Sequence, residues 1–144
     1  MNILQRPDGT IDEQAEWILS ELAKWFKVNS EAIYGTRPFR VSGEGSSYVK
    51  IEGFCEDQVE WKDDDFRFVQ KDGNLYAFIM KAKDRKTTVI KSLNNDEVVS
   101  EVTLLGYGSV PFMQHSGVLV VDLPDERDKE YPNALKIQTS FTGL

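Results

Sequence analysis

The chain has only one cysteine and one histidine among its 144 residues. Because Cys55 has no second thiol to pair with, an intramolecular disulfide is excluded. One Cys and one His cannot supply the common zinc ligand sets, so the sequence predicts no metal site and no cofactor. His115 stands alone beside a predicted turn, and Cys55 has no neighbour that would activate its thiol. Neither residue is therefore predicted to be catalytic.

An excess of basic residues and a long apolar run are also missing. The formal net charge is −7 and no basic patch emerges, which argues against nucleic acid and anionic membranes as partners. No segment approaches the roughly 20 apolar residues that a membrane-spanning helix needs. The first residues lack the basic start and apolar run of a secretory signal peptide, so we expect a cytoplasmic protein.

The strongest periodic pattern lies near the start of the chain and predicts an amphipathic helix. Apolar residues recur at helical spacing and form one stripe: Ile11, Ala15, Ile18, Leu19, Leu22, Trp25 and Phe26. Ahead of most of them, Thr10 and Glu13 have the spacing of a capping box. Asn29 is predicted to close the helix in a left-handed conformation. Trp17 falls off the stripe, and we expect it to cover the neighbouring domain rather than lie in water.

The rest of the chain changes to the patterns of loops and strands. Residues 34–45 are predicted to be a connector, because three glycines and a proline interrupt them. Strand-like runs follow at residues 48–54, 66–71, 75–80, 87–93, 98–105, 110–114, 118–123 and 134–141. Asp72-Gly73 and Ser116-Gly117 are hairpin signals between consecutive runs.

Short strands separated by turns, with no helix between them, predict antiparallel pairing. Seven or eight such strands normally form two packed sheets. The expected fold is therefore mainly β: an antiparallel two-sheet β-sandwich preceded by one amphipathic N-terminal α-helix. A small closed barrel is the alternative that the pattern leaves open.

Six segments carry a family resemblance: residues 6–11 (RPDGTI), 25–39 (WFKVNSEAIYGTRPF), 74–77 (NLYA), 88–93 (TVIKSL), 102–106 (VTLLG) and 117–124 (GVLVVDLP). In this order they resemble the end of the catalytic barrel and the C-terminal domain of the α-L-fucosidases of glycoside hydrolase family 29. The resemblance implies that residues 1–42 are a remnant of the last barrel turn, its helix and a connector. Residues 43–144 would be the C-terminal β-sandwich domain. Two features depart from the family: the Asn-x-Gly-Pro run before the first turn is missing, and Ser30 stands where Gly is common.

The resemblance also implies that this chain alone is inactive. In these retaining glycosidases the catalytic nucleophile and the acid/base lie on barrel segments upstream of the helix. Structural support for a catalytic barrel is therefore the first expectation for this chain, and a free-standing carbohydrate-binding module is the alternative. Family members are often secreted, periplasmic or lysosomal, which would require a leader upstream.

The carboxylates of the chain gather in predicted turns, at residues 63–65, 96–97 and 125–126. Glycoside hydrolysis requires two carboxyl groups about 5–10 Å apart, one of them kept protonated by its surroundings. No pair stands out for this task. We expect these groups to be solvated loop charges, because Asp and Glu are seldom buried.

Two sets of side chains are candidates for binding. The sugar-binding candidates are the aromatic residues Trp61, Tyr48 and Tyr107. The packing candidates are Ile11, Ile18, Leu22, Trp25 and Phe26 on the helix. Leaving that stripe in water costs about 25 cal/mol for each Å² of apolar area. We therefore expect it to pack onto the sandwich, onto a fucosidase barrel, or onto a second copy in a two-fold homodimer.

Overall fold

The computed structural model describes residues 3–47 and 60–141. Within these ranges it contains one α-helix, α1 (Glu13–Asn29), which continues into a 3₁₀ turn, η1 (Ser30–Ala32). The strands are β1 (Arg37–Glu44), β2 (Phe66–Lys71), β3 (Asn74–Ile79), β4 (Thr87–Ile90), β5 (Glu97–Leu104), β6 (Gly108–Ser109), β7 (Phe112–His115), β8 (Val118–Asp122) and β9 (Asn133–Phe141). In this part of the chain no helix is long and apolar enough to cross a membrane.

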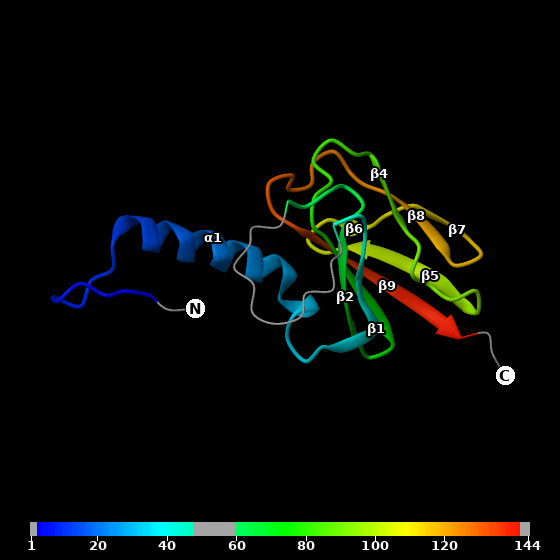
Figure 1. The fold of residues 1–144 in the computed structure, drawn as a ribbon, viewed down its shortest axis with the longest axis horizontal. Helices are drawn as coiled ribbons and strands as arrows, with labels where there is room; N and C mark the ends of the chain where they lie inside the picture. The colour runs from blue at the N-terminus through cyan, green and yellow to red at the C-terminus, as the bar shows by residue number, and fades with distance from the viewer. Residues whose placement is uncertain (1–2, 48–59, 142–144) are drawn as a thin grey trace.

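The strands form two sheets, and every strand pair is antiparallel (Figure 1). One sheet has six strands in the order β1-β2-β3-β9-β5-β6, and the other has three in the order β4-β8-β7. Among the described strands neither sheet closes on itself, so these strands form two open sheets rather than a closed barrel. The predicted fold, a mainly β sandwich preceded by one helix, is confirmed.

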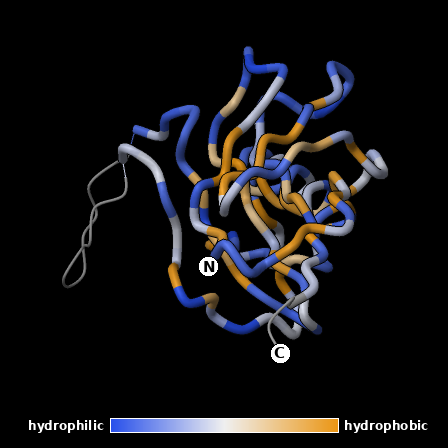
Figure 2. Tube along the Cα trace, turned by 90° about the vertical axis from the view of Figure 1, so that its right-hand side faces the viewer, coloured by the Kyte–Doolittle hydropathy of each residue, from blue (hydrophilic) through white to orange (hydrophobic). Residues whose placement is uncertain are grey.

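The core combines side chains of both sheets. Phe66 and Phe68 of β2 are buried with their rings stacked at 6.1 Å, and Leu119 and Val121 of β8 are buried in the same cluster. Figure 2 shows the hydrophobic residues concentrated along the strands inside the molecule and the hydrophilic ones at its outer turns. Burying each such side chain contributes about 1.5–3 kcal/mol, so sheet-to-sheet packing holds the sandwich together.

Both predicted hairpins are present. Asp72 and Gly73, with φ of 51° and 77°, connect β2 to β3. Ser116 and Gly117, with φ of 45° and 79°, connect β7 to β8. Two consecutive residues with positive φ are the requirement of the tight turn that matches strand twist. These local signals therefore fixed the register of both strand pairs.

The predicted connector over residues 34–45 is wrong in its second part, where β1 pairs with β2. The ladder shifts register between Pro38 and Gly43, so these two predicted breakers lie within an irregular strand. β1 is the edge of its sheet, where proline and irregular pairing are tolerated. The predicted boundary between residues 42 and 43 falls inside this strand. The strand predicted over residues 48–54 lies outside the described residues.

Both ends of the helix differ from the prediction. Asp12, not Thr10, is the N-cap, and its carboxylate accepts a 2.7 Å hydrogen bond from the N–H of Ala15. Thr10 instead donates to Asp8. Asn29 has φ of −111°, and the chain continues as η1 until Gly35 takes the left-handed conformation with φ of 73°. Asn29 donates its side-chain N–H to the carbonyl of Trp25 within the helix.

Candidate functional site

The C-terminal turns of α1 contact the sandwich, and Trp25 is the centre of this junction. The indole Nε1–H donates to the carbonyl of Pro132, just before β9, over 2.8 Å. Its ring stacks on Phe78 of β3 at 6.2 Å. One turn later Val28 packs closely against Gly106, where a larger residue would clash with the Val28 side chain. These contacts place the end of α1 on the outer face of the six-stranded sheet.

A polar network holds η1 on the same sheet face. The carboxylate of Glu31 accepts hydrogen bonds from the hydroxyl of Tyr76 at 2.8 Å and from Nζ of Lys136 at 2.7 Å. Nζ of Lys71 donates to the backbone carbonyls of Glu31 and Tyr34. The hydrogen bond from Lys136 lowers the pKa of Glu31, with a further contribution from Tyr76. Burial, and next the Glu31 carboxylate, raise the pKa of the Tyr76 phenol.

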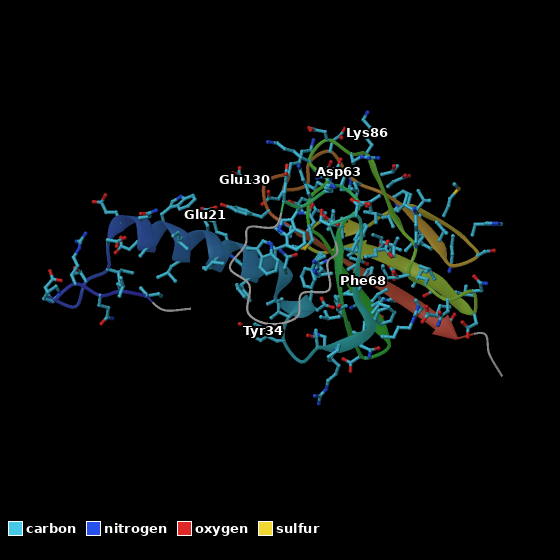
Figure 3. The ribbon with its side chains drawn as sticks, in the orientation of Figure 1. Glu21, Tyr34, Asp63, Phe68, Lys86 and Glu130 are labelled. Atoms are coloured by element: carbon cyan, nitrogen blue, oxygen red, sulfur yellow. The ribbon has the colours of Figure 1, made fainter. Side chains whose placement is uncertain are left out.

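The N-terminal half of α1 projects away from the sandwich (Figure 1). It leaves an apolar groove of about 420 Å³ between helix and sandwich, lined by Trp17, Ile18, Glu21, Leu22, Trp25, Tyr131 and Pro132. A second hollow of about 330 Å³ lies at the start of the helix and is lined by Ile3, Leu4, Asp12, Gln14, Ala15, Ile18 and Leu19. Figure 3 labels Glu21 on this projecting part. We call the apolar side chains of these two hollows the uncovered face of α1.

The packing candidates divide between the junction and the uncovered face. Trp25 and Phe26 are half-buried, and their rings meet edge to face at 5.3 Å. Ile11 and Leu22 are also half-buried, whereas Ile18 is exposed. The expectation that Trp17 covers the sandwich is wrong, because its side chain is 60% exposed at the rim of the groove. Trp17 lies on the N-terminal part of the helix, which projects away from the sandwich (Figure 1).

The two sugar-binding candidates that the structure describes have different surroundings. Trp61 is half-buried and lies under the guanidinium of Arg67, 4.7 Å from its ring centre. Tyr107 lies at the junction, where its hydroxyl accepts a hydrogen bond from the N–H of Asp128 and its ring borders a hollow of about 180 Å³. Tyr48 lies outside the described residues. The two described candidates share no hollow.

The expectation of solvated carboxylates is wrong for Asp65 and Glu97, which are both buried. Burial alone would raise the pKa of Asp65, but hydrogen bonds from Lys62 and Ser47 outweigh it and lower that pKa. Glu97 forms a two-pronged ion pair with Arg40, at 2.7 and 2.9 Å, and also accepts from the N–H of Asn94. Both carboxylates therefore secure loops of the sandwich.

The described part of the chain contains no cluster of side chains suited to binding a metal ion. No group of three His, Cys, Asp or Glu residues there could hold a metal ion. His115 ends β7 and is exposed beside its hairpin turn. Tyr131 and Pro132 were not among the residues that the sequence singled out, and they form one wall of the apolar groove. An aromatic residue and a proline ending a charged run were the available signal.

Comparison with known proteins identifies the family of this chain. The model of the α-L-fucosidase C-terminal domain matches residues 58–138, more than half of the chain. The chain belongs to this family. No curated protein matches it.

Solved fucosidases share the fold over almost the whole chain. An α-fucosidase of Thermotoga maritima, in complex with a mechanism-based inhibitor, is 20% identical with a TM-score of 0.68 over 94% of this chain and 29% of its own. α-L-Fucosidase isoenzyme 1 from Paenibacillus thiaminolyticus is 19% identical with a TM-score of 0.69 over 96% of this chain and 30% of its own. The chain thus spans less than a third of the length of these structures.

Proposed function

We propose that this chain is the non-catalytic C-terminal portion of an α-L-fucosidase of glycoside hydrolase family 29, and that α1 docks it onto a catalytic barrel. The observation that carries the proposal is the uncovered face of α1 in a chain that spans less than a third of the similar fucosidases. The barrel is supplied by the rest of a longer polypeptide or by a separate chain.

The chemistry of the uncovered face supports a protein partner. The groove beside Trp17 and Leu22 is almost wholly apolar, and it is walled on the other side by Tyr131 and Pro132 of the sandwich. A partner seated there touches helix and sandwich together, so docking also fixes the direction of the projecting helix. Covering this area recovers about 25 cal/mol for each Å² of apolar surface.

The carboxylates support a non-catalytic role. A glycosidase needs one carboxyl group kept protonated beside an ionised one. Asp65 is instead stabilised in its ionised form by backbone N–H groups, and Glu97 is held by Arg40. Both are engaged in holding the sandwich.

A hydrolysis assay tests the absence of catalysis. The purified chain is expected to release no chromophore from a chromogenic α-L-fucoside above the rate in buffer. Release that disappears when one of the chain's own carboxylates is replaced would overturn the proposal.

A binding experiment tests the docking. A barrel fragment of a family fucosidase, prepared without its own C-terminal region, is mixed with the chain and followed by analytical ultracentrifugation. We expect a one-to-one complex that is abolished by Leu22→Asp on the uncovered face. Ser20→Asp adds the same charge on the opposite, exposed side of α1 and is expected to leave the complex intact. A complex that tolerates Leu22→Asp contradicts docking through this face, and a stable dimer of the chain alone favours self-association.

The carbohydrate-binding alternative has narrower support. Trp25, Tyr107 and Tyr131 border the 180 Å³ hollow at the junction, and Tyr107 is one of the predicted sugar-binding residues. Saturable NMR shifts of these residues on titration with fucose would favour the alternative. Unchanged spectra would leave the structural role as the better account.

A further inference from the structure

One arginine of the sandwich is buried without a carboxylate partner. Arg127, in the loop between β8 and β9, is only 5% exposed. Its Nη2 donates to the carbonyls of Ala82 and Arg85, and its Nε has no hydrogen-bond partner in the described structure. In the same residues no Asp or Glu approaches its guanidinium within ion-pair distance. Burial lowers the pKa of Arg127, against opposing effects of Asp125, Tyr107 and Asp84.

A buried charge is costly unless an opposite charge or a full set of hydrogen bonds compensates it. Carbonyl oxygens compensate Arg127 in part, and two acidic side chains lie near enough to favour its charged form. Direct contact with an anion is the interaction that this guanidinium lacks.

Arg127 borders a hollow of about 250 Å³ formed by the loops after β3 and β8. Four cationic side chains line this hollow, Lys81, Lys83, Arg127 and Lys129, against two acidic ones, Asp128 and Glu130. Asp128 already accepts hydrogen bonds from two N–H groups of its own loop, those of Glu130 and Tyr131. The residues that line the hollow therefore carry a net positive charge, in a chain whose formal net charge is −7.

The two loops are firmly joined at this end of the sandwich. The N–H of Leu123 donates to the carbonyl of Lys86 over 2.8 Å, and Arg127 bridges to the carbonyls of Ala82 and Arg85. Figure 3 labels Lys86 and Glu130, one from each loop. No residue of α1 lines the hollow, although Tyr131 borders both this hollow and the apolar groove.

From this placement we propose that the hollow binds a small oxyanion, with Lys83 and Lys129 holding it at the mouth and Arg127 beneath. Guanidinium and ammonium groups are the usual partners of sulfate, phosphate and carboxylate. The volume lies below the 300–1,000 Å³ typical of pockets for larger ligands, so the site takes a single anionic group. A free inorganic anion and the sulfate of an acidic sugar share this chemistry. The site goes beyond the proposed docking role and does not depend on it.

The test is an NMR titration of the chain with sodium sulfate at constant ionic strength, set with sodium chloride. We expect saturable shifts of the backbone amides of residues 80–84 and 127–131. Shifts that are linear, or equally large with chloride alone, overturn the proposal. A sulfated monosaccharide forms a second arm: tighter binding than sulfate assigns the site to acidic sugars, and equal binding assigns it to the free anion.

Lysine variants test the location of the site. Arg127 is left unchanged, because it also donates hydrogen bonds to the carbonyls of Ala82 and Arg85. Lys83→Gln with Lys129→Gln should weaken sulfate binding about fivefold to tenfold, because the double variant removes two exposed charge pairs of modest strength. Lys86→Gln removes an exposed lysine that does not line the hollow and should leave the affinity unchanged. Equal affinity in the double variant and the wild type would overturn the assignment.

Discussion

The indole of Trp25 donates to the carbonyl of Pro132 across 107 positions of sequence, over a distance of 2.8 Å. This bond, with the stacking of Trp25 on Phe78 and the packing of Val28 against Gly106, ties the C-terminal end of the helix to the sandwich. Beyond it the helix runs free of the strands (Figure 1). The junction is therefore the place where the domain resists or transmits a movement of the helix.

The first prediction concerns this bond. Trp25→Phe keeps an aromatic ring against Phe78 but removes the donor, so the free energy of unfolding should fall by about 0.5–1.5 kcal/mol. Urea unfolding measures the loss, and hydrogen exchange at the C-terminal turns of α1 should become faster. Trp17→Phe is the matched control, and its effect should stay within about 0.5 kcal/mol because Trp17 is exposed. Equal losses in the two variants would contradict the anchoring role.

The second prediction concerns the pH dependence of the η1 network. The pKa of Glu31 is lowered in the folded state by Lys136 and Tyr76. Its contribution is therefore present above the ordinary pKa of 4.5 and is lost as the pH falls through the lower folded value. Glu31→Gln should reduce stability at pH 7 by less than about 1 kcal/mol, since the carboxylate is 44% exposed.

The difference between wild type and Glu31→Gln should vanish in acid. Urea unfolding at a series of pH values from 7 to 3 follows it. Glu126→Gln, at an exposed loop position, serves as the control and should show no such trend. If the stability difference between wild type and Glu31→Gln grows as the pH falls, the pKa of Glu31 is not lowered by folding.

The third prediction concerns the ion pair of Arg40 and Glu97. The side chain of Glu97 is 5% exposed and that of Arg40 is 35% exposed. Arg40→Met leaves a buried carboxylate uncompensated and should cost about 3 kcal/mol. Glu97→Gln leaves a cation that water can reach and should cost about 1 kcal/mol. Urea unfolding of both single variants and the double variant measures the asymmetry, and the double variant should be more stable than Arg40→Met. Equal losses of stability in Arg40→Met and Glu97→Gln would contradict this asymmetry.

The fourth prediction concerns Gly106. Its φ is 86°, and a Cβ there would lie 2.5 Å from Cγ1 of Val28 in α1. Gly106→Ala should therefore destabilise the chain by the conformational cost, about 1 kcal/mol, and by a further steric cost. Gly108→Ala is matched in conformation, with φ of 95°, but has nothing within 4 Å and should show the first cost alone.

Adding Val28→Ala separates the two costs. In the Gly106→Ala background it should recover the steric part, as measured by urea unfolding. If Gly106→Ala and Gly108→Ala lose the same stability, then Val28 and Gly106 do not restrict each other.

The parts of the fold that follow from neighbouring residues could be predicted. The stripe from Ala15 to Phe26 indicated α1, and Asp72-Gly73 and Ser116-Gly117 indicated the two hairpins. β1 could not be predicted, because Pro38 and Gly43 have the appearance of breakers until pairing with β2 is known. The helix cap was misassigned since Thr10 and Asp12 are both competent caps, and the chain uses Asp12.

The candidate site could be predicted only in part. Trp25 was recognised as a packing residue, but its partners Phe78 and Pro132 come from strands and loops far along the chain. The burial of Asp65 and Glu97 was missed for the same reason. Composition favours exposed carboxylates, and only the folded chain supplies the N–H groups and the guanidinium that compensate them.

By itself, the sequence determined the amphipathic helix, the hairpin turns and the antiparallel strands, because each depends on spacing between residues close in the chain. It favoured two packed sheets, and the structure decided between them and a closed barrel. The tertiary structure alone decided which part of the helix the sandwich covers and which part it leaves open. It also decided that a buried arginine and several lysines meet around one hollow. Such placements depend on contacts between distant segments, whose energies are set by burial and by charge compensation rather than by local pattern.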